Sequence, residues 1–227
     1  PMVIGLTIVA MGTSAPEAAV SITSSIAGQN DMALANVVGS NFFNILIVLG
    51  VSCIISTLPV EKNTIKKDTP FLLFVSGLLL IFSIDLNISR IEGFIFLAIF
   101  TYFLIDTVKT AKNSDSKVED VPSEDSPMFK TILLCILGII GIVLGGDMVV
   151  KSASSIAKSF GMSDNLVGLT IVAIGTSLPE FVTSVVAVRK GENDIAIGNI
   201  IGSNIFNILF VLGLSTFINP ISISMFA

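Results

Sequence analysis

The sequence predicts an all-α transmembrane fold built around two inverted repeats, and three observations support this. Of the 227 residues, 52% are hydrophobic and only 13% are charged, whereas soluble domains carry about 25% charged residues. Apolar runs long enough to cross a bilayer recur between polar breaks. A stretch near the start of the chain returns near its end at a constant offset of 163 residues. Because so few charges cannot cover a surface that faces water, we expect most of the chain to lie in a membrane.

Seven apolar runs of roughly 15 to 25 residues have the length of membrane spans. They are Val3–Ala27, Met32–Thr57, Pro70–Ile84, Ile91–Val108, Met128–Ala153, Val167–Val188 and Ile195–Ile218. Between the fourth and fifth runs, residues 109–127 are rich in charge, serine and proline, so they cannot bury apolar area and are expected to form a solvated linker.

The basic residues predict how the protein lies in the membrane. Nine of the 12 Lys and Arg residues follow the second, fourth and sixth runs, whereas Arg90, Lys151 and Lys158 lie on the opposite side. Since loops rich in Lys and Arg stay in the cytoplasm, the linker at 109–127 is expected to be cytoplasmic, in a multi-pass protein of the cell (plasma) membrane. The net charge is −5 and no basic face is present, which excludes a nucleic-acid partner.

The internal repeat is the most informative feature. Gly5–Ser52 aligns without a gap onto Gly168–Ser215, with about 28 of 48 positions identical. The second copy begins five spans after the first, and an odd number of crossings reverses direction, so the copies are inverted in the membrane. Inverted repeats are typical of secondary transporters, whose substrate binds near the midplane where the copies meet.

The repeat also predicts the organisation of the chain. The segments are 1–57 (first repeat, two spans), 58–108 (two further spans), 109–127 (linker), 128–160 (one long span), 161–218 (second repeat, two spans) and 219–227 (the start of a remainder). Restoring the symmetry would need about one helix before the first copy and about two after the second, so the chain is expected to hold about seven of ten spans.

Each repeat carries a proline and a glutamate inside an apolar run. Pro16 and Pro179 lack an N–H group, so we expect the core helices to break there. Glu17 and Glu180 follow directly, and a carboxylate near the membrane midplane costs about 2.5–3.5 kcal/mol on insertion scales. No Lys or Arg within these runs could neutralise the pair. A bound cation could.

The second run of each repeat adds neutral oxygen ligands. Ser40 and Asn44 share one helix face, as do Ser203 and Asn207. Carboxylate, hydroxyl and amide oxygens suit hard cations such as Na⁺ and Ca²⁺, and the chain has no histidine to build a transition-metal site. The alternative is that the Ser, Thr, Asn and Gly residues only hold membrane helices together.

The paired motifs GTSAPE with GSNFFN, and GTSLPE with GSNIFN, resemble the two α-repeats of the cation/Ca²⁺ exchanger superfamily, and most of all its prokaryotic sodium/calcium exchangers. The resemblance implies side-chain ion ligands at Thr13, Ser14, Glu17, Ser40, Asn44, Thr176, Ser177, Glu180, Ser203 and Asn207, with main-chain carbonyls from Ala10 and Ala173. Some relatives, including potassium-dependent exchangers, have Asp in place of Asn207. The GNxxE-type motif of proton/calcium exchangers is absent.

The resemblance therefore implies an antiporter that exchanges Na⁺ for Ca²⁺ by alternating access at a midplane carboxylate site. A proton-coupled cation antiporter and a cation channel stay open as alternatives. An enzyme is not expected, since the sequence shows no nucleophile–base pair and no cofactor motif. The expected partners are membrane lipid and the transported Na⁺ and Ca²⁺, with no cofactor and no obligate protein partner.

Overall fold

The structure, a computed structural model, describes residues 2–114, 128–162, 171 and 173–223. Most of the predicted linker at 109–127 lies outside the described residues. The same holds for the first part of the second repeat at 163–170 and for the end of the chain at 224–227.

The first repeat is a bent helix followed by a second, continuous one. Helix α1 (Met2–Ile4), the π-helical segment η1 (Gly5–Val9) and α2 (Ala10–Thr13) lead into α3 (Ala15–Ile26) across a bend of 48°. Ser14 lies at the interruption, with φ −83° and ψ 9°. After a turn at Gly28, whose φ is 76°, the chain continues as α4 (Asn30–Phe43), η2 (Asn44–Val48) and α5 (Leu49–Ile55).

The second repeat has the same plan. Helix α10 (Ala173–Thr176) is followed by α11 (Leu178–Arg189), with Ser177 between them at φ −87° and ψ 4°. Helix α12 (Asn193–Phe206), the π-helical segment η6 (Asn207–Leu212) and α13 (Gly213–Ile218) complete it. Both π-helical segments of the second runs begin at equivalent asparagines, Asn44 and Asn207. Such segments are often found at functional sites.

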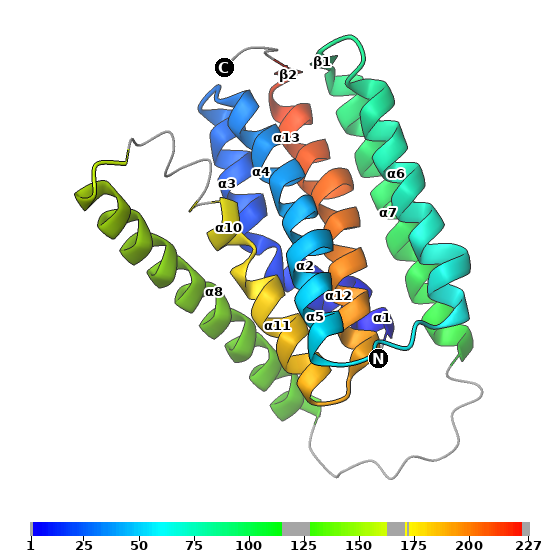
Figure 1. The fold of residues 1–227 in the computed structure, drawn as a ribbon. Coiled ribbons are helices and arrows are strands. Elements are labelled where there is room, and N and C mark those ends of the chain that lie inside the picture. The colour runs from blue at the N-terminus through cyan, green and yellow to red at the C-terminus, as the bar shows by residue number, and fades with distance from the viewer. Residues whose placement is uncertain (1, 115–127, 163–170, 172, 224–227) are drawn as a thin grey trace.

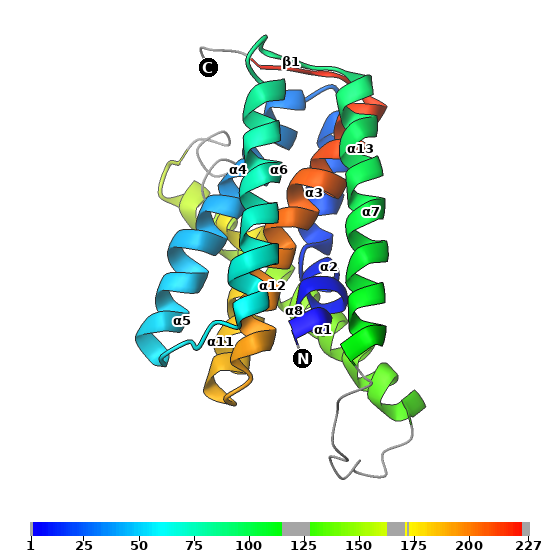
Figure 2. The same cartoon turned by 90° about the vertical axis from the view of Figure 1, so that its right-hand side faces the viewer.

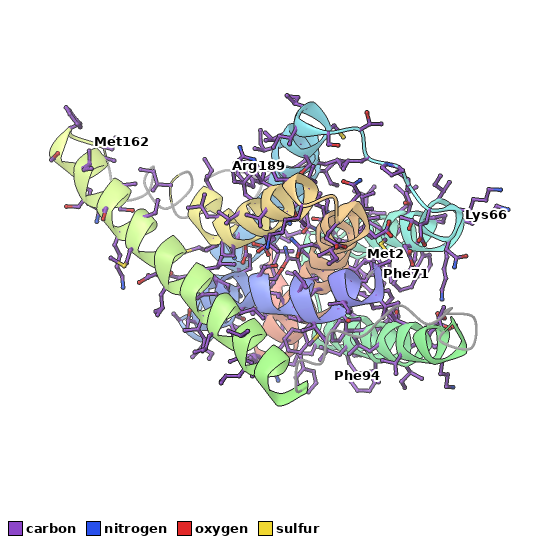
Figure 3. The ribbon with its side chains drawn as sticks, turned by 90° about the horizontal axis from the view of Figure 1, so that it is seen from below. Met2, Lys66, Phe71, Phe94, Met162 and Arg189 are labelled. Carbon is purple, nitrogen blue, oxygen red and sulfur yellow. The ribbon has the colours of Figure 1, made fainter. Side chains whose placement is uncertain are left out.

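Three further helices flank this core. On one side lies a pair of helices, α6 (Thr69–Phe82), which continues from the π-helical segment η3 (Thr64–Asp68), and α7 (Arg90–Ser114). The rings of Phe71 and Phe103 stack between them, with centroids 5.1 Å apart. Helix α8 (Met128–Ser159) lies obliquely on the opposite side (Figure 1). Seen from below, Met162, just beyond α8, and Lys66, before α6, lie at opposite sides of the molecule (Figure 3).

One feature differs from the all-α expectation. Strand β1 (Asn87–Ile88), between α6 and α7, pairs antiparallel with β2 (Ile221–Ser222), which follows α13. This short ribbon joins the flanking helix pair to the end of the second repeat (Figure 2). Ile88 and Ile221 face each other in it and are fully buried.

Small residues let the two repeats approach closely. A Cβ atom built on Gly198 would lie 2.7 Å from the Met2 carbonyl oxygen, and one on Gly202 would lie 2.5 Å from that of Leu6. Gly198 and Gly202 have the small-xxx-small spacing that permits close helix contacts in membranes. The contact places α12 of the second repeat directly against η1 of the first.

Length and composition identify four helices in the described residues that could cross a membrane, namely Asn30–Ile55, Arg90–Thr110, Ile136–Ser159 and Asn193–Ile218. The bent pair Met2–Thr13 and Ala15–Ile26 would be a fifth. Helix α6 has only 14 residues, and part of the sixth predicted span lies outside the described residues. The protein is therefore a multi-pass membrane protein, while the count of seven spans and the role of the prolines in the breaks stay predictions.

Candidate cation-binding site

Two glutamates lie fully buried at the centre of the core. Glu17 is in the first turn of α3 and Glu180 is in the first turn of α11, and both have 0% exposure. The start of a helix favours negative charge because its free N–H groups and dipole point there. The salt bridges of the described residues, Lys67–Asp106 and Lys151–Asp147, involve neither glutamate.

Each glutamate is held by a serine from the other repeat. Ser14 donates a hydrogen bond of 2.6 Å to Glu180 Oε1, and Ser177 donates one of 2.9 Å to Glu17 Oε1. Ser40 adds a longer contact of 3.4 Å to Glu17 Oε1. Each of these two hydroxyls therefore crosses to the glutamate of the opposite repeat.

The second oxygen of each carboxylate is available to a ligand. Glu17 Oε2 and Glu180 Oε2 are buried and have no hydrogen-bond partner among the described residues. The same is true of both side-chain polar atoms of Asn44 and of Asn207 Oδ1. Buried polar atoms without partners are costly, by about 1–3 kcal/mol each. A cation bound among these oxygens would offset that cost.

Two asparagines that the sequence reasoning missed belong to the same network. Asn36 of α4 donates from Nδ2 to the Glu17 carbonyl oxygen at 3.3 Å and to Ser21 Oγ at 2.9 Å. Its Oδ1 accepts a hydrogen bond of 3.3 Å from Thr176 Oγ1. Asn36 is four residues before Ser40, so it lies on the predicted ligand face.

Asn199 of α12 repeats this arrangement at the equivalent position. Its Nδ2 donates to the Glu180 carbonyl oxygen at 3.3 Å and to Ser184 Oγ at 3.0 Å. Thr13 Oγ1 donates to its Oδ1 at 3.1 Å. The signal in the sequence was an asparagine identical in both copies and in step with the Ser and Asn ligands.

The remaining predicted ligands are close to this network but less tightly tied to it. The Ala10 carbonyl oxygen accepts from the Ser14 N–H at 3.0 Å and from Thr13 Oγ1 at 3.3 Å. Ala173 begins α10, and its side chain is outside the description. Ser203 and Asn207 are fully buried. Asn207 Nδ2 donates to Asn41 Oδ1 at 3.1 Å, a contact between the repeats.

The polar atoms gathered here are mostly oxygens. Among the described residues no group of three or more His, Cys, Asp or Glu side chains could hold a metal ion. The candidate site instead offers two carboxylates, with hydroxyl, amide and carbonyl oxygens around them. This chemistry suits Na⁺ or Ca²⁺ better than Zn²⁺ or Cu²⁺, which favour nitrogen and sulfur ligands.

Comparisons with known proteins cover nearly the whole chain. The sequence model of the family described as "Sodium/calcium exchanger protein" matches residues 1–108 and 130–226. CaxA of Alkalimonas amylolytica is 45% identical over 226 residues, which are 97% of this chain and 71% of that protein. The sodium/calcium exchanger MaX1 of Methanosarcina acetivorans is 33% identical over 261 residues, 98% of this chain and 75% of that protein.

A solved structure extends the similarity to the fold. The sodium-calcium exchanger NCX_Mj, soaked with 10 mM Na⁺ and zero Ca²⁺, superposes with a TM-score of 0.85 at 34% sequence identity. The match covers 98% of this chain and 73% of that one. The resemblance drawn from the paired motifs is thereby confirmed.

Proposed function

This chain belongs to the sodium/calcium exchanger family, and from that premise we propose that it exchanges Na⁺ for Ca²⁺ across the membrane by alternating access. Its relatives are membrane exchangers rather than enzymes, so cation exchange transport is the activity to be explained. The finer proposal concerns which ions are exchanged and where they bind.

The observation that carries the proposal is the pair of fully buried glutamates with crossed serine contacts. Two carboxylates balance the charge of one Ca²⁺ or of two Na⁺, so either cargo can neutralise Glu17 and Glu180. Because both ions would use the same oxygens, they would compete for one site. Competition of this kind is what an antiporter needs in order to exchange one ion for the other.

The proposed ligand set follows the two repeats. The carboxylates of Glu17 and Glu180 supply the charge, and neutral oxygens come from Ala10, Thr13, Ser14, Ser40, Asn44, Ala173, Thr176, Ser177, Ser203 and Asn207. Ala10 and Ala173 would contribute their main-chain carbonyls. Burial of these side chains supports the assignment for the residues whose exposure is described.

The proposed setting is a pair of inverted repeats with the site near the membrane midplane. Seven spans of an expected ten, with core helices opened near Pro16 and Pro179, would let the site face one side at a time. The excess of Lys and Arg after the second, fourth and sixth spans supports a cytoplasmic position for the linker at 109–127. The proposed location of the protein is the plasma membrane.

Sodium rather than protons is proposed as the coupling ion on the basis of residue chemistry. The chain has no histidine to relay protons. Position 207 is an asparagine that cannot titrate, and its Nδ2 is engaged with Asn41. A site with only two titratable ligands is better suited to cation competition than to a proton relay.

The test is to drive Ca²⁺ uptake by one gradient at a time. The purified protein is reconstituted into vesicles loaded with Na⁺, with K⁺, or with an acidic K⁺ buffer, and ⁴⁵Ca²⁺ entry is followed. We expect uptake only with the outward Na⁺ gradient. Uptake driven by the pH gradient without Na⁺ would replace this proposal with a proton-coupled antiporter, and fast uptake without either gradient would indicate a channel.

A further inference from the structure

We propose that Asn36 and Asn199 are positioning residues that fix the hydroxyl protons of Thr176 and Thr13, so that each threonine presents only oxygen lone pairs to the transported cation. The inference rests on the proposed ion site and adds to it two residues that do not themselves touch the ion. It also explains why each asparagine reaches across to the opposite repeat.

The orientation of each amide is determined by its neighbours. Asn36 contacts the Glu17 carbonyl oxygen, which can only accept a hydrogen bond, so the atom facing it must be the NH₂ group. Ser21 Oγ, at 2.9 Å, takes the second proton of that group. The amide oxygen is then directed at Thr176 Oγ1, 3.3 Å away.

Asn199 is oriented by the same logic in the other half. The Glu180 carbonyl oxygen and Ser184 Oγ accept from Nδ2, which leaves Oδ1 to accept from Thr13 Oγ1. Asn36 is 5% exposed and Asn199 is fully buried. If either amide rotated, the main-chain carbonyl of the glutamate in its own repeat would lose its hydrogen bond from Nδ2.

The direction of a hydroxyl proton decides whether the hydroxyl can bind a cation well. A threonine hydroxyl has one proton and two lone pairs. When the Thr13 proton points at Asn199 Oδ1, both lone pairs are free for the ion. The alternative acceptors are the Ala10 carbonyl oxygen at 3.3 Å and the carboxylate of Glu180, and both are proposed ligands. Loss of Asn199 would send the proton to one of them and weaken two ligands at once.

The crossed geometry links the two halves of the site. Asn199 lies on α12, and its Nδ2 donates to the Glu180 carbonyl oxygen of its own repeat. Its Oδ1 accepts from Thr13 of α2, in the first repeat. Asn36 on α4 does the converse for Thr176 of α10. Each threonine oxygen is therefore positioned relative to the glutamate of the opposite copy, so the hydroxyls of one repeat are ready to bind only when the other repeat is docked against it.

The test is a double-mutant cycle on Ca²⁺ binding, measured by titration calorimetry on the purified protein in Na⁺-free detergent solution. Outer-shell partners of metal ligands typically change affinity by about 10- to 100-fold, so Asn199→Leu and Thr13→Val should each weaken binding by about tenfold or more. Of the two single variants, one will bind Ca²⁺ less tightly. The double variant should bind Ca²⁺ no more than about threefold less tightly than that one, because both changes remove the same interaction.

The matched control combines Thr13→Val with Asn36→Leu, since Asn36 hydrogen-bonds to Thr176 and not to Thr13. The losses of Ca²⁺ affinity caused by these two changes should multiply in the double variant, because the changes are independent. Thr13→Ser, which keeps the hydroxyl, should bind Ca²⁺ within about threefold of wild type, a rescue that a role in packing alone would not produce. If Asn199→Leu does not give a folded protein, the equivalent cycle of Asn36→Leu with Thr176→Val carries the test.

The proposal is overturned if the losses of Ca²⁺ affinity caused by Thr13→Val and Asn199→Leu multiply in the double variant as fully as those of the control pair do. The same titrations of Glu17→Gln and Glu180→Gln separate this result from a failure of the proposed function. If Ca²⁺ binding survives both glutamine variants, the ion site itself is wrong. If both abolish binding while the cycle shows no coupling, only the positioning role is refuted.

Discussion

The contact between η1 and α12 allows the effect of one added methyl group to be predicted. A Cβ at position 202 would lie 2.5 Å from the Leu6 carbonyl oxygen, 2.8 Å from Leu6 Cα and 2.9 Å from Ala10 Cβ. Real Cβ contacts are essentially never shorter than 3.0 Å. Two of the three obstructing atoms belong to the backbone, so no side-chain rotation relieves the overlap and the two helices must move apart.

The free energy of unfolding changes through two opposing effects. Forcing extra carbon into a packed interior costs about 1–3 kcal/mol, and the backbone atoms place Gly202→Ala near the upper value. Alanine is better than glycine in a helix by about 1 kcal/mol. The net loss is therefore about 2 kcal/mol. Gly50→Ala in α5, where no atom lies within 4 Å of the new Cβ, should instead gain up to about 1 kcal/mol.

Equilibrium unfolding of both variants in mixed micelles with increasing SDS measures this difference. Gly202→Ala should unfold at lower SDS than wild type and Gly50→Ala at the same or higher SDS. Because α2 carries Thr13 and α12 carries Asn199, Gly202→Ala should also weaken Ca²⁺ binding. Equal stability of the two variants would refute the close contact of the repeats at Gly202.

Two further changes test the charge of the proposed site and the start of α6. Asn207→Asp adds a third carboxylate and should raise the affinity for Ca²⁺ relative to Na⁺ by roughly tenfold, since ligand charge tightens Ca²⁺ sites. The control Asn63→Asp, at an exposed position, should leave the affinities for both ions unchanged. If Na⁺ competes with Ca²⁺ in Asn207→Asp as it does in wild type, Asn207 is not a ligand. Burial raises the pKa of Asp68, which precedes α6, above its ordinary value of 3.8, so the native state loses stability as the pH rises from that value through the raised one. Asp68→Asn should therefore be more stable than wild type at pH 7 and lose this advantage near pH 3.5, and unfolding curves that keep the same difference at both pH values would contradict it.

Much of the site followed from the repeat. Because Glu17 and Glu180 occupy equivalent positions in two copies, their meeting at the centre of the core could be expected from the offset of 163 residues alone. The hydroxyls of Ser14 and Ser177 were placed near them for the same reason. The lack of a basic residue in those spans then predicted a cation as the partner of the two carboxylates.

The crossing of the contacts could not be read from the sequence. Helical spacing places Thr13, Ser14 and Glu17 on one face, but the Ser14 hydroxyl donates to Glu180 of the other repeat. Which serine meets which carboxylate depends on how the repeats dock, and local periodicity does not encode that.

Asn36 and Asn199 were overlooked for a different reason. About 28 identities between the copies gave too many equivalent pairs to single out two that bind backbone carbonyls rather than ions. The ribbon of Asn87–Ile88 with Ile221–Ser222 was also missed, because two-residue strands have no periodicity to detect.

The central claim is that Glu17 and Glu180 together hold the exchanged ions. The most direct test is ⁴⁵Ca²⁺ uptake into Na⁺-loaded vesicles by wild type, Glu17→Gln, Glu180→Gln and, as the matched control, the exposed Glu61→Gln. We predict that uptake requires the outward Na⁺ gradient, vanishes in both buried variants and is unchanged in the control. Sodium-driven uptake that persists in either Glu17→Gln or Glu180→Gln would contradict the paired site.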